Sequence, residues 1–204
     1  MSLDNAAMTV YGDSISGNCL KVKFVAERLG IPFDWVETSV IEKQTRTPEF
    51  LAMNPAGQVP LVRFAVGRIL AQSNAIMLHL AEDSDLIPEN AWERALMYQW
   101  LFWEQYSHEP IIAVRRFHKH YLKKTDAEID PSLKPRGEKV LGLMNDHLQS
   151  RRYFTGGRLS LADIALVAYT RFAHEGGYDL ANHPAVKDWV RRVEDDLNIE
   201  HAGG

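Results

Sequence analysis

The sequence has almost no cysteine, no long apolar run and no excess of positive charge, and each absence excludes a class of protein. One cysteine in 204 residues permits neither an intrachain disulfide nor a Cys-x-x-Cys redox pair. No apolar stretch approaches the roughly 20 residues that a membrane-spanning helix needs. The formal net charge of -4 argues against general nucleic-acid binding, which requires a basic face. We therefore expect neither a membrane nor a nucleic acid among the partners of this chain.

Metal-binding spacings and export signals are also missing. No His-Glu-x-x-His pattern occurs, and His118 and His120 are only two positions apart, so their side chains diverge on a helix. The segment Met1–Asn5 lacks the basic and apolar regions of a signal peptide. We therefore expect a cytoplasmic protein with no metal site.

What is present divides the chain into two parts, and the first part alternates strand and helix patterns. Val22, Val25 and Leu29 follow the spacing of a half-buried helix, and a second helix opens at residues 72–74. Four short runs favour strands: Met8–Tyr11, Phe33–Val36, Leu61–Phe64 and Arg68–Ala71. The βαβ-ββα order predicts an α/β domain over residues 1–83, whose last two strands form an antiparallel hairpin.

The second part carries helical patterns only. A polar segment at 84–90 separates it from the first part, and we interpret this segment as a linker. Apolar residues recur at helical spacing beyond it, so we expect an all-helical domain over residues 91–204. Glu109-Pro110 should interrupt the first long helix, because proline has no N–H for the helical hydrogen bond. Ser160-Leu-Ala-Asp163 resembles a capping box and predicts the start of an apolar helix, which we expect to end at Gly176-Gly177.

The stretch Asn54-Pro-Ala-Gly-Gln-Val-Pro-Leu61 combines two prolines with a glycine. Each proline pushes the residue before it into extended geometry, so we expect Asn54 and Val59 to be extended. Pro60 stands at the start of a strand, where it removes one N–H from the ladder. An extended Val59 at such a strand entry can offer its backbone groups to a peptide-like ligand.

Four motifs, in this order and spacing, resemble the glutathione transferase family over nearly the whole chain. They are Ser16-Gly-Asn-Cys-Leu-Lys-Val22, Thr47-Pro-Glu-Phe-Leu-Ala-Met-Asn-Pro-Ala-Gly-Gln-Val-Pro60, Gln72-Ser-Asn-Ala-Ile76 and Ser160-Leu-Ala-Asp-Ile164. The resemblance implies a thioredoxin-like domain followed by a helical bundle. It also implies glutathione as a co-substrate, no other cofactor, and a homodimer.

The first motif resembles the bacterial serine- and asparagine-type enzymes, similar to the theta, phi and nu-like classes. Tyr11 lies inside the first strand, which does not match the tyrosine classes, and Asn18 stands where the bacterial beta class has its cysteine. The resemblance implies Ser16 and Asn18 as catalytic residues, with Ser16 stabilising the glutathione thiolate. By spacing alone both are equally well capping residues. Cys19 is either a half-buried residue at the helix start or a redox-active thiol, and we expect Lys21 to be solvated.

The resemblance assigns the remaining glutathione contacts to the first domain. It implies a cis Val59-Pro60 bond, with the valine backbone paired to the cysteinyl part of glutathione. The helix N-terminus at Gln72 and Ser73 suits the γ-glutamyl carboxylate, although Ser73 is equally plausible as a simple N-cap. Arg46 or Lys43 reaches the glycyl carboxylate, or both are plain surface charges.

Aromatic and basic residues of the second domain suggest a wall for the acceptor substrate, with Tyr106, His108 and Arg115 as its candidate lining. At helical spacing these side chains can equally belong to the core or to a dimer interface. Three functions stay open: conjugation of glutathione to small electrophiles, glutathione-dependent disulfide or peroxide reduction, and glutathione binding without catalysis. We expect the first, with Asp163 in a capping role rather than a catalytic one.

Overall fold

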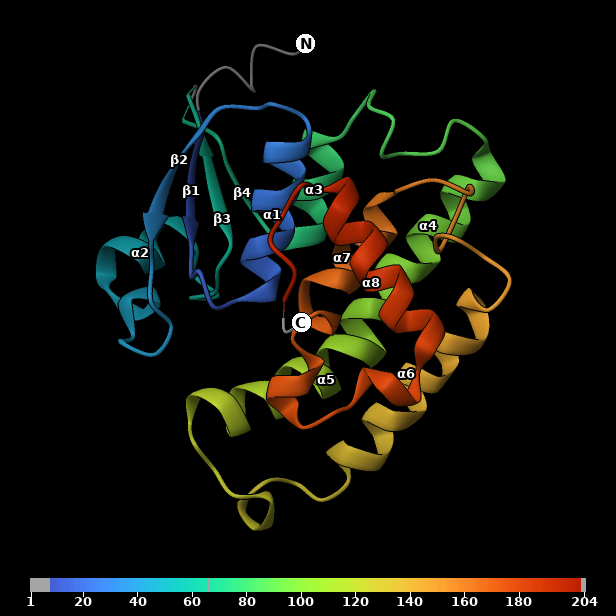
Figure 1. Cartoon of the computed structure of the whole chain (residues 1–204). Helices are drawn as coiled ribbons and strands as arrows, with labels where there is room; N and C mark the ends of the chain where they lie inside the picture. The colour runs from blue at the N-terminus through green and yellow to red at the C-terminus, as the bar shows by residue number, and fades with distance from the viewer. Residues whose placement is uncertain (1–7, 66, 203–204) are drawn as a thin grey trace. The chain divides into compact units, whose positions relative to one another are not determined.

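The structure is a computed structural model that describes residues 8–65 and 67–202. The segment Met1–Asn5 discussed above lies outside these ranges. The chain divides into two compact units, Met1–Asp85 and Leu86–Gly204. The first contains a sheet with helices and the second contains helices, as Figure 1 shows. The combination of an α/β part and an all-α part, expected from the sequence, is confirmed.

The first unit is built on a four-stranded sheet with the strand order β2-β1-β3-β4. The strands are β1 (Met8–Gly12), β2 (Phe33–Glu37), β3 (Leu61–Phe64) and β4 (Ile69–Ala71). β1 pairs in parallel with β2 and antiparallel with β3, and β3 and β4 form the predicted antiparallel hairpin. Leu61 and Val62 are neighbours on β3 and both are 0% exposed. Because neighbouring side chains point to opposite faces, the centre of the sheet is buried on both sides.

Helices α1 (Gly17–Arg28) and α3 (Ser73–Leu80) pack together on one side of this sheet, and α2 (Pro48–Met53) lies beyond the other (Figure 1). The predicted apolar stripe of α1 is buried, with Val22 and Val25 0% exposed. A short 3-10 turn, Gln44–Arg46, precedes α2. The packing of α1 against α3 places the starts of the two helices next to each other, which becomes important for the site below.

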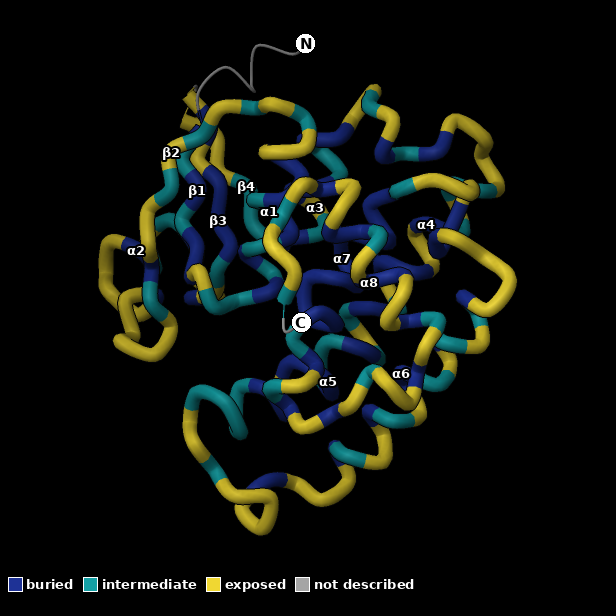
Figure 2. Tube along the Cα trace, viewed as in Figure 1, coloured by how far each residue is buried: buried dark blue, intermediate teal, exposed yellow. Residues whose placement is uncertain are grey.

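The second unit contains no strand within residues 86–202. Its main helices are α4 (Ala91–Trp103), α5 (Glu109–Arg116), α6 (Leu133–Leu148), α7 (Leu161–Thr170) and α8 (Pro184–Asp196). Every residue of α7 is buried, and this helix is dark blue along its length in Figure 2. Such a helix has to be surrounded by others, and α4 and α8 both pack against it.

The start of α7 confirms the predicted capping box. The Asp163 carboxylate accepts hydrogen bonds from the Ser160 N–H at 3.0 Å and from the Ser160 hydroxyl at 2.7 Å. It also accepts from the Phe154 N–H and from the indole N–H of Trp189, both at 2.9 Å. These bonds satisfy donors that would otherwise be buried without partners, and they join α7 to α8. Asp163 therefore stabilises the fold.

Two helix boundaries differ from the sequence-based expectation. The interruption near Pro110 comes one turn earlier, as a π-helical segment at Glu104–His108, and Pro110 lies in the first turn of α5. Proline has no N–H for the helical ladder, and the π-helical segment directly before α5 is where the regular α-helical hydrogen bonding gives way. Helix α7 ends at Thr170 rather than at Gly176-Gly177, because a 3-10 turn over Ala173–Gly176 replaces its last part. Within residues 8–65 and 67–202 no helix has the length and apolarity to cross a membrane.

Candidate active site

The loop between β1 and α1 is held in place by two acidic side chains. Asp13 is 3% exposed, and its carboxylate accepts from the Ile15 N–H at 3.1 Å and the Val40 N–H at 2.8 Å.

Glu37, at the end of β2, accepts from the N–H and the hydroxyl of Ser14 at 2.9 and 3.1 Å. Partial burial opposes ionisation, but these bonds and one from the Trp35 indole hold the pKa of Glu37 below its usual value. The loop that carries Ser16 is thus tied to the second strand.

Ser16 occupies the N-cap of α1 without using its side chain as a cap. Its backbone is extended, with φ -85° and ψ 119°, and its carbonyl accepts from the Cys19 and Leu20 N–H groups at 3.0 Å each. The Ser16 hydroxyl makes no capping hydrogen bond to the helix. A half-buried hydroxyl therefore stands at the positive end of a 12-residue helix, where an anion is stabilised.

Cys19 lies beneath this hydroxyl and is 0% exposed. Burial raises the pKa of its thiol to about 12, although hydrogen bonds from the Asp13 N–H, at 3.3 Å from the sulfur, and from the Ser16 side chain act in the opposite direction. A buried thiol that resists ionisation is a poor nucleophile. The structure therefore argues against the redox-active alternative for Cys19.

Asn18, Lys21 and Ser73 form a hydrogen-bonded cluster between the starts of α1 and α3. The Asn18 side-chain oxygen accepts from the Lys21 ammonium at 2.8 Å and from the Ser73 hydroxyl at 3.2 Å. Lys21 is 0% exposed, so the expectation that it is solvated was wrong. Its position three residues after Asn18 and four before Val25 places it on the buried stripe of α1.

Ser73 is the first residue of α3 rather than its N-cap, which corrects the simple capping interpretation. The N-cap is Gln72, and its side chain makes no capping hydrogen bond. Gln72 is exposed and has φ 74° and ψ 112°, a region that side-chain-bearing residues rarely adopt. Backbone strain of this kind persists where the surrounding structure enforces it, and it is often found at ligand sites.

The stretch before β3 is a stiff turn organised by Asn54. The Asn54 amide donates to the Gln58 carbonyl at 2.8 Å, and its side-chain oxygen accepts from the Ala56 N–H at 3.2 Å. The Val59-Pro60 peptide bond is cis, as the resemblance implied. Val59 is half-buried and directly precedes β3, so it stands at the strand entry that the sequence predicted.

The two cations proposed for the glycyl carboxylate are both exposed. Arg46 lies against the turn at Gly57, where a Cβ would fall 2.3 Å from its Nη1 atom, and that atom is 3.4 Å from the Ala56 carbonyl oxygen. Glycine is favoured at Gly57 by its φ of 61°, and a Cβ there would also fall 3.1 Å from the Thr45 carbonyl oxygen. Lys43 also has a positive φ, 61°, and caps the 3-10 turn that carries Arg46. The structure thus places Arg46, but not Lys43, against the turn before Val59.

The three candidate acceptor residues have very different environments within the helical unit. Tyr106 is 88% exposed, whereas His108 is 0% exposed and bonds to the Thr170 hydroxyl at 2.9 Å. Arg115 is 4% exposed and donates to the Gly176 carbonyl at 2.8 Å and to Asp126 at 2.6 Å. Of the three, only Tyr106 presents its side chain to solvent; the other two join parts of the helical unit.

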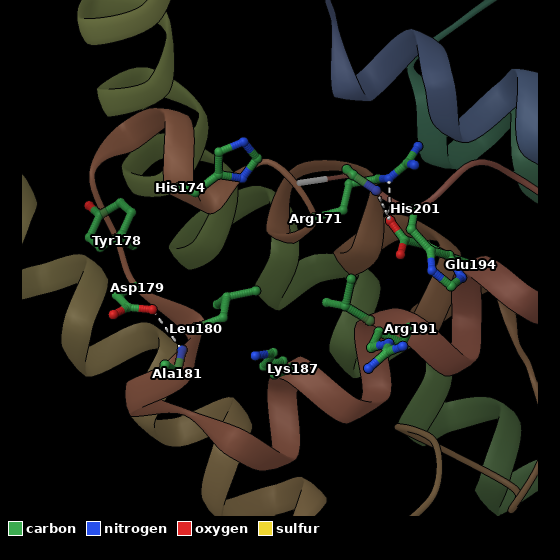
Figure 3. Close-up of a pocket in the computed structure, with 12 residues that line it drawn as sticks. Arg171, His174, Tyr178, Asp179, Leu180, Ala181, Lys187, Arg191, Glu194 and His201 are labelled. Atoms are coloured by element: carbon green, nitrogen blue, oxygen red, sulfur yellow. Dashed lines mark hydrogen bonds and ion pairs between the residues drawn. The ribbon is translucent and has the colours of Figure 1, made fainter. Parts of the chain in front are cut away.

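A separate cavity of about 380 Å³ lies in the helical unit, between the end of α7, α8 and the segment that follows α8. Figure 3 shows basic side chains around it, including Arg171, Lys187 and Arg191. Arg171 is paired with Glu194 at 2.9 Å. None of the three candidate acceptor residues lines this cavity, so it is distinct from the wall that the sequence suggested.

Sequence reasoning missed two residues of the site, Asp13 and Lys21. Asp13 directly follows the first strand, where polar side chains commonly organise a loop, but nothing in the sequence indicates its bond to Val40. Lys21 did carry a signal, because it falls on the apolar stripe defined by Val22 and Val25. Among the residues that the structure describes, no group of three or more His, Cys, Asp or Glu side chains is arranged to hold a metal ion.

Comparison with known proteins gives matches over both units. Residues 15–83 match the family model for the N-terminal domain of glutathione S-transferases, and residues 95–196 match the model for their C-terminal domain. A solved glutathione S-transferase from Xanthobacter autotrophicus Py2 is 42% identical, with a TM-score of 0.88 over 92% of each chain. One from Pseudomonas fluorescens Pf-5 is 42% identical, with a TM-score of 0.89 over 92% of this chain and 94% of that one.

A curated relative adds a different activity to the comparison. The disulfide-bond oxidoreductase YfcG of Escherichia coli K12 is 29% identical over 153 residues, which is 72% of this chain and 71% of the relative. The chain is therefore similar both to transferases and to a disulfide oxidoreductase.

Proposed function

Since the chain belongs to the glutathione S-transferase family, we propose that it activates glutathione in its first unit and conjugates the thiolate to small electrophiles. One observation carries this proposal: the Ser16 hydroxyl stands at the N-terminus of α1 but does not cap that helix. Next to it, Asn18 and Ser73 bring polar groups from the starts of α1 and α3 together. This arrangement supports a site for a thiolate.

Activation requires the glutathione thiol to ionise near neutral pH. A free thiol has a pKa near 8.5, and each unit of lowering needs about 1.4 kcal/mol of preference for the anion. The N-terminus of α1 supplies roughly 0.3–1 kcal/mol, and a hydrogen bond from Ser16 to the thiolate roughly 1.5–3 kcal/mol. Together they lower the thiol pKa by about one to three units. No general base is needed.

We propose that the rest of the tripeptide is held along the edge of the first unit. The Val59 backbone, ahead of Pro60, pairs with the cysteinyl residue of glutathione. The N–H groups at Gln72 and Ser73 bind the γ-glutamyl carboxylate, because the N-terminus of α3 favours an anion. Arg46, or Lys43, binds the glycyl carboxylate by charge. Asn18 contacts the ligand near its sulfur.

A second function, reduction of disulfides by glutathione, is favoured by the similarity to the disulfide-bond oxidoreductase YfcG. The burial and raised pKa of Cys19 exclude that thiol as the electron donor in this proposal. Two glutathione molecules would supply the two electrons: each thiol loses its proton, the pair becomes glutathione disulfide, and the substrate disulfide becomes two thiols. Ser16 would stabilise the attacking thiolate in the same way.

The domain bounds and the assembly belong to the same proposal. We assign residues 1–83 to the glutathione-binding domain, 84–90 to the linker and 91–204 to the helical domain. The exposed Tyr106 is assigned to the acceptor side, whereas His108 and Arg115 are buried within the helical unit. A cytoplasmic homodimer that acts in detoxification is the form in which we expect the protein to work.

The test is glutathione binding by calorimetry, followed by parallel assays with an aryl halide, a hydroperoxide and a mixed disulfide. We expect binding at or below millimolar glutathione and the highest kcat/KM with the aryl halide. A higher kcat/KM with the mixed disulfide would select the reductase function instead. Binding without turnover of any of the three would leave only a glutathione-binding role, and absence of binding at millimolar glutathione would contradict the whole proposal.

A further inference from the structure

We propose that Lys21 is a positioning residue: its ammonium fixes the orientation of the Asn18 amide, and so sets which end of that amide faces the glutathione sulfur. This inference rests on the proposed function and deepens it. Lys21 does not touch the ligand in this proposal. It acts only through Asn18.

The first step is the chemistry of the hydrogen bond. Lys21 Nζ is 2.8 Å from Asn18 Oδ1, and an ammonium is a donor with no acceptor capacity. The amide therefore has to present its oxygen, not its nitrogen, to Lys21. The Ser73 hydroxyl, 3.2 Å from the same oxygen, is a second donor. The carbonyl end of Asn18 is thus held by two donors, and its NH₂ end is turned away from both.

The second step is burial. Lys21 is 0% exposed, while Asn18, one turn earlier on α1, is only partly buried. An ammonium taken out of water is costly, and an apolar residue at this position would continue the stripe of Val22 and Val25 without that cost. A purely apolar contact would not discriminate between the two ends of an amide. The charge is what gives Asn18 a defined orientation.

The third step connects the two ends of the ligand. Ser73 lies at the start of α3, which is proposed to bind the γ-glutamyl carboxylate, and Asn18 lies two residues after Ser16. The Asn18 side-chain oxygen therefore connects the part of the site proposed for the γ-glutamyl carboxylate with the part proposed for the thiolate. If Lys21 is removed, the amide can rotate and lose the N–H that it offers the sulfur, even when glutathione still binds.

The test is a double-mutant cycle with Lys21→Met and Asn18→Ala, read out by the ultraviolet absorbance of the bound glutathione thiolate as a function of pH. For Lys21→Met we expect the thiol pKa to rise by about half a unit to one unit, which is about three- to tenfold less thiolate at a fixed lower pH. Asn18→Ala should give a similar rise. The double variant should rise no further than either single variant, because both changes remove the same interaction.

Lys23→Met is the matched control, because Lys23 lies on the same helix, is half-exposed and pairs with Glu27 at 3.9 Å. It should leave the thiol pKa unchanged. If Lys21→Met and Asn18→Ala lose equal stability without a change in the thiol pKa, Lys21 has a structural role and the proposal is overturned. Additive effects of the two substitutions on the thiol pKa overturn it as well. If Lys21→Met does not fold, Ser73→Ala removes the second donor to the same oxygen, and an unchanged thiol pKa there also overturns it.

The outcomes separate this inference from the proposed function. If the wild-type protein binds no glutathione, both are wrong. If it binds glutathione, and Ser16→Ala raises the thiol pKa but Lys21→Met does not, the proposed function stands and the role of Lys21 is rejected.

Discussion

Two serines occupy helix N-caps in this protein, and they differ in what their side chains do. Ser160, before α7, is 1% exposed and donates its hydroxyl to Asp163, so the capping box is closed. Ser16, before α1, is half-buried; its side chain makes no capping bond to the helix backbone and hydrogen-bonds to the Cys19 thiol instead. The residue three positions later explains the difference: it is Asp163 in one case and Cys19 in the other. A thiol sulfur is a weak hydrogen-bond acceptor, whereas a carboxylate accepts several strong hydrogen bonds at once.

The comparison shows how the same local pattern serves stability in one unit and a proposed ligand site in the other. At α7 the Ser160 and Asp163 side chains bond to each other and to nearby backbone groups, and the whole helix is buried. At α1 the helix start is positioned from outside, through Asp13, Glu37 and Ser73. A helix N-terminus that is not closed by its own cap retains its attraction for an external anion.

The largest effect, a loss of stability, is expected at the Ser160-Asp163 capping box of α7. Asp163→Ala removes the acceptor of four hydrogen bonds and leaves buried donors at Phe154, Ser160 and Trp189 without it. We expect a loss of about 3–5 kcal/mol in the free energy of unfolding. Urea denaturation followed by far-ultraviolet circular dichroism measures it. The exposed Asp146 on α6 is the matched control, and a loss below about 1 kcal/mol at Asp163 would contradict the importance given to this cap.

A somewhat smaller effect is expected on the pH dependence of stability, through Asp163. Burial raises the pKa of Asp163 from 3.8 to about 6, against the hydrogen bonds from Phe154, Trp189 and Ser160. The folded state thus holds the proton more tightly than the unfolded state, so the stabilising contribution is complete below pH 3.8 and is lost as the pH rises through about 6. About two units correspond to roughly 3 kcal/mol.

The unfolding free energy of the wild type, compared with that of Asp163→Asn between pH 4 and pH 7, tests this sign. The advantage of the wild type should shrink as the pH rises. An advantage that grows over the same range would mean that the carboxylate, rather than the carboxylic acid, is the form that the folded protein prefers.

At Ser16, the N-cap of α1, we expect an effect on the pKa of the glutathione thiol rather than on protein stability. Ser16→Ala should raise the pKa of bound glutathione by about one unit, because roughly 1.5 kcal/mol of hydrogen bonding to the thiolate is lost. The rate of conjugation at pH 6.5 should fall about tenfold, and Ser16→Thr should restore part of it. Ser160→Ala is the paired variant: it should lower stability by about 1 kcal/mol without moving the thiol pKa. If Ser160→Ala moved the thiol pKa and Ser16→Ala only lowered stability, the distinction between the two N-cap serines would be wrong.

The smallest effect is expected at Cys19. Because its thiol is 0% exposed and its pKa is raised to about 12, it should not react with a thiol reagent such as 5,5′-dithiobis(2-nitrobenzoic acid) in the native protein at pH 7.5. It should react fully once the chain is unfolded in guanidinium chloride. Rapid stoichiometric labelling of the native protein would restore the redox-active alternative.

Much of the fold could be predicted because its signals are local. The strand runs, the buried stripe of α1 and the Ser160-Asp163 capping box depend on residues a few positions apart, and the structure confirms them. The helix boundary near Pro110 was displaced because the α-helical hydrogen bonding changes in the π-helical turn ahead of the proline rather than at the proline itself. Side-chain environments were less predictable: Lys21 resembles a surface residue by type, and only its position on the stripe indicated burial.

The order of amino acids alone was sufficient to indicate two structural parts, the stretch around Val59-Pro60 and the serine at the start of α1, since these follow from short-range periodicity and backbone sterics. Only the tertiary structure decided which side chains meet across the fold. It joined Asn18 to Ser73, tied Asp13 to Val40 and buried Cys19 and Lys21. The physical reason is that these contacts depend on how α1 packs against α3 and on where the loop after β2 runs. No local spacing in the chain encodes either of them.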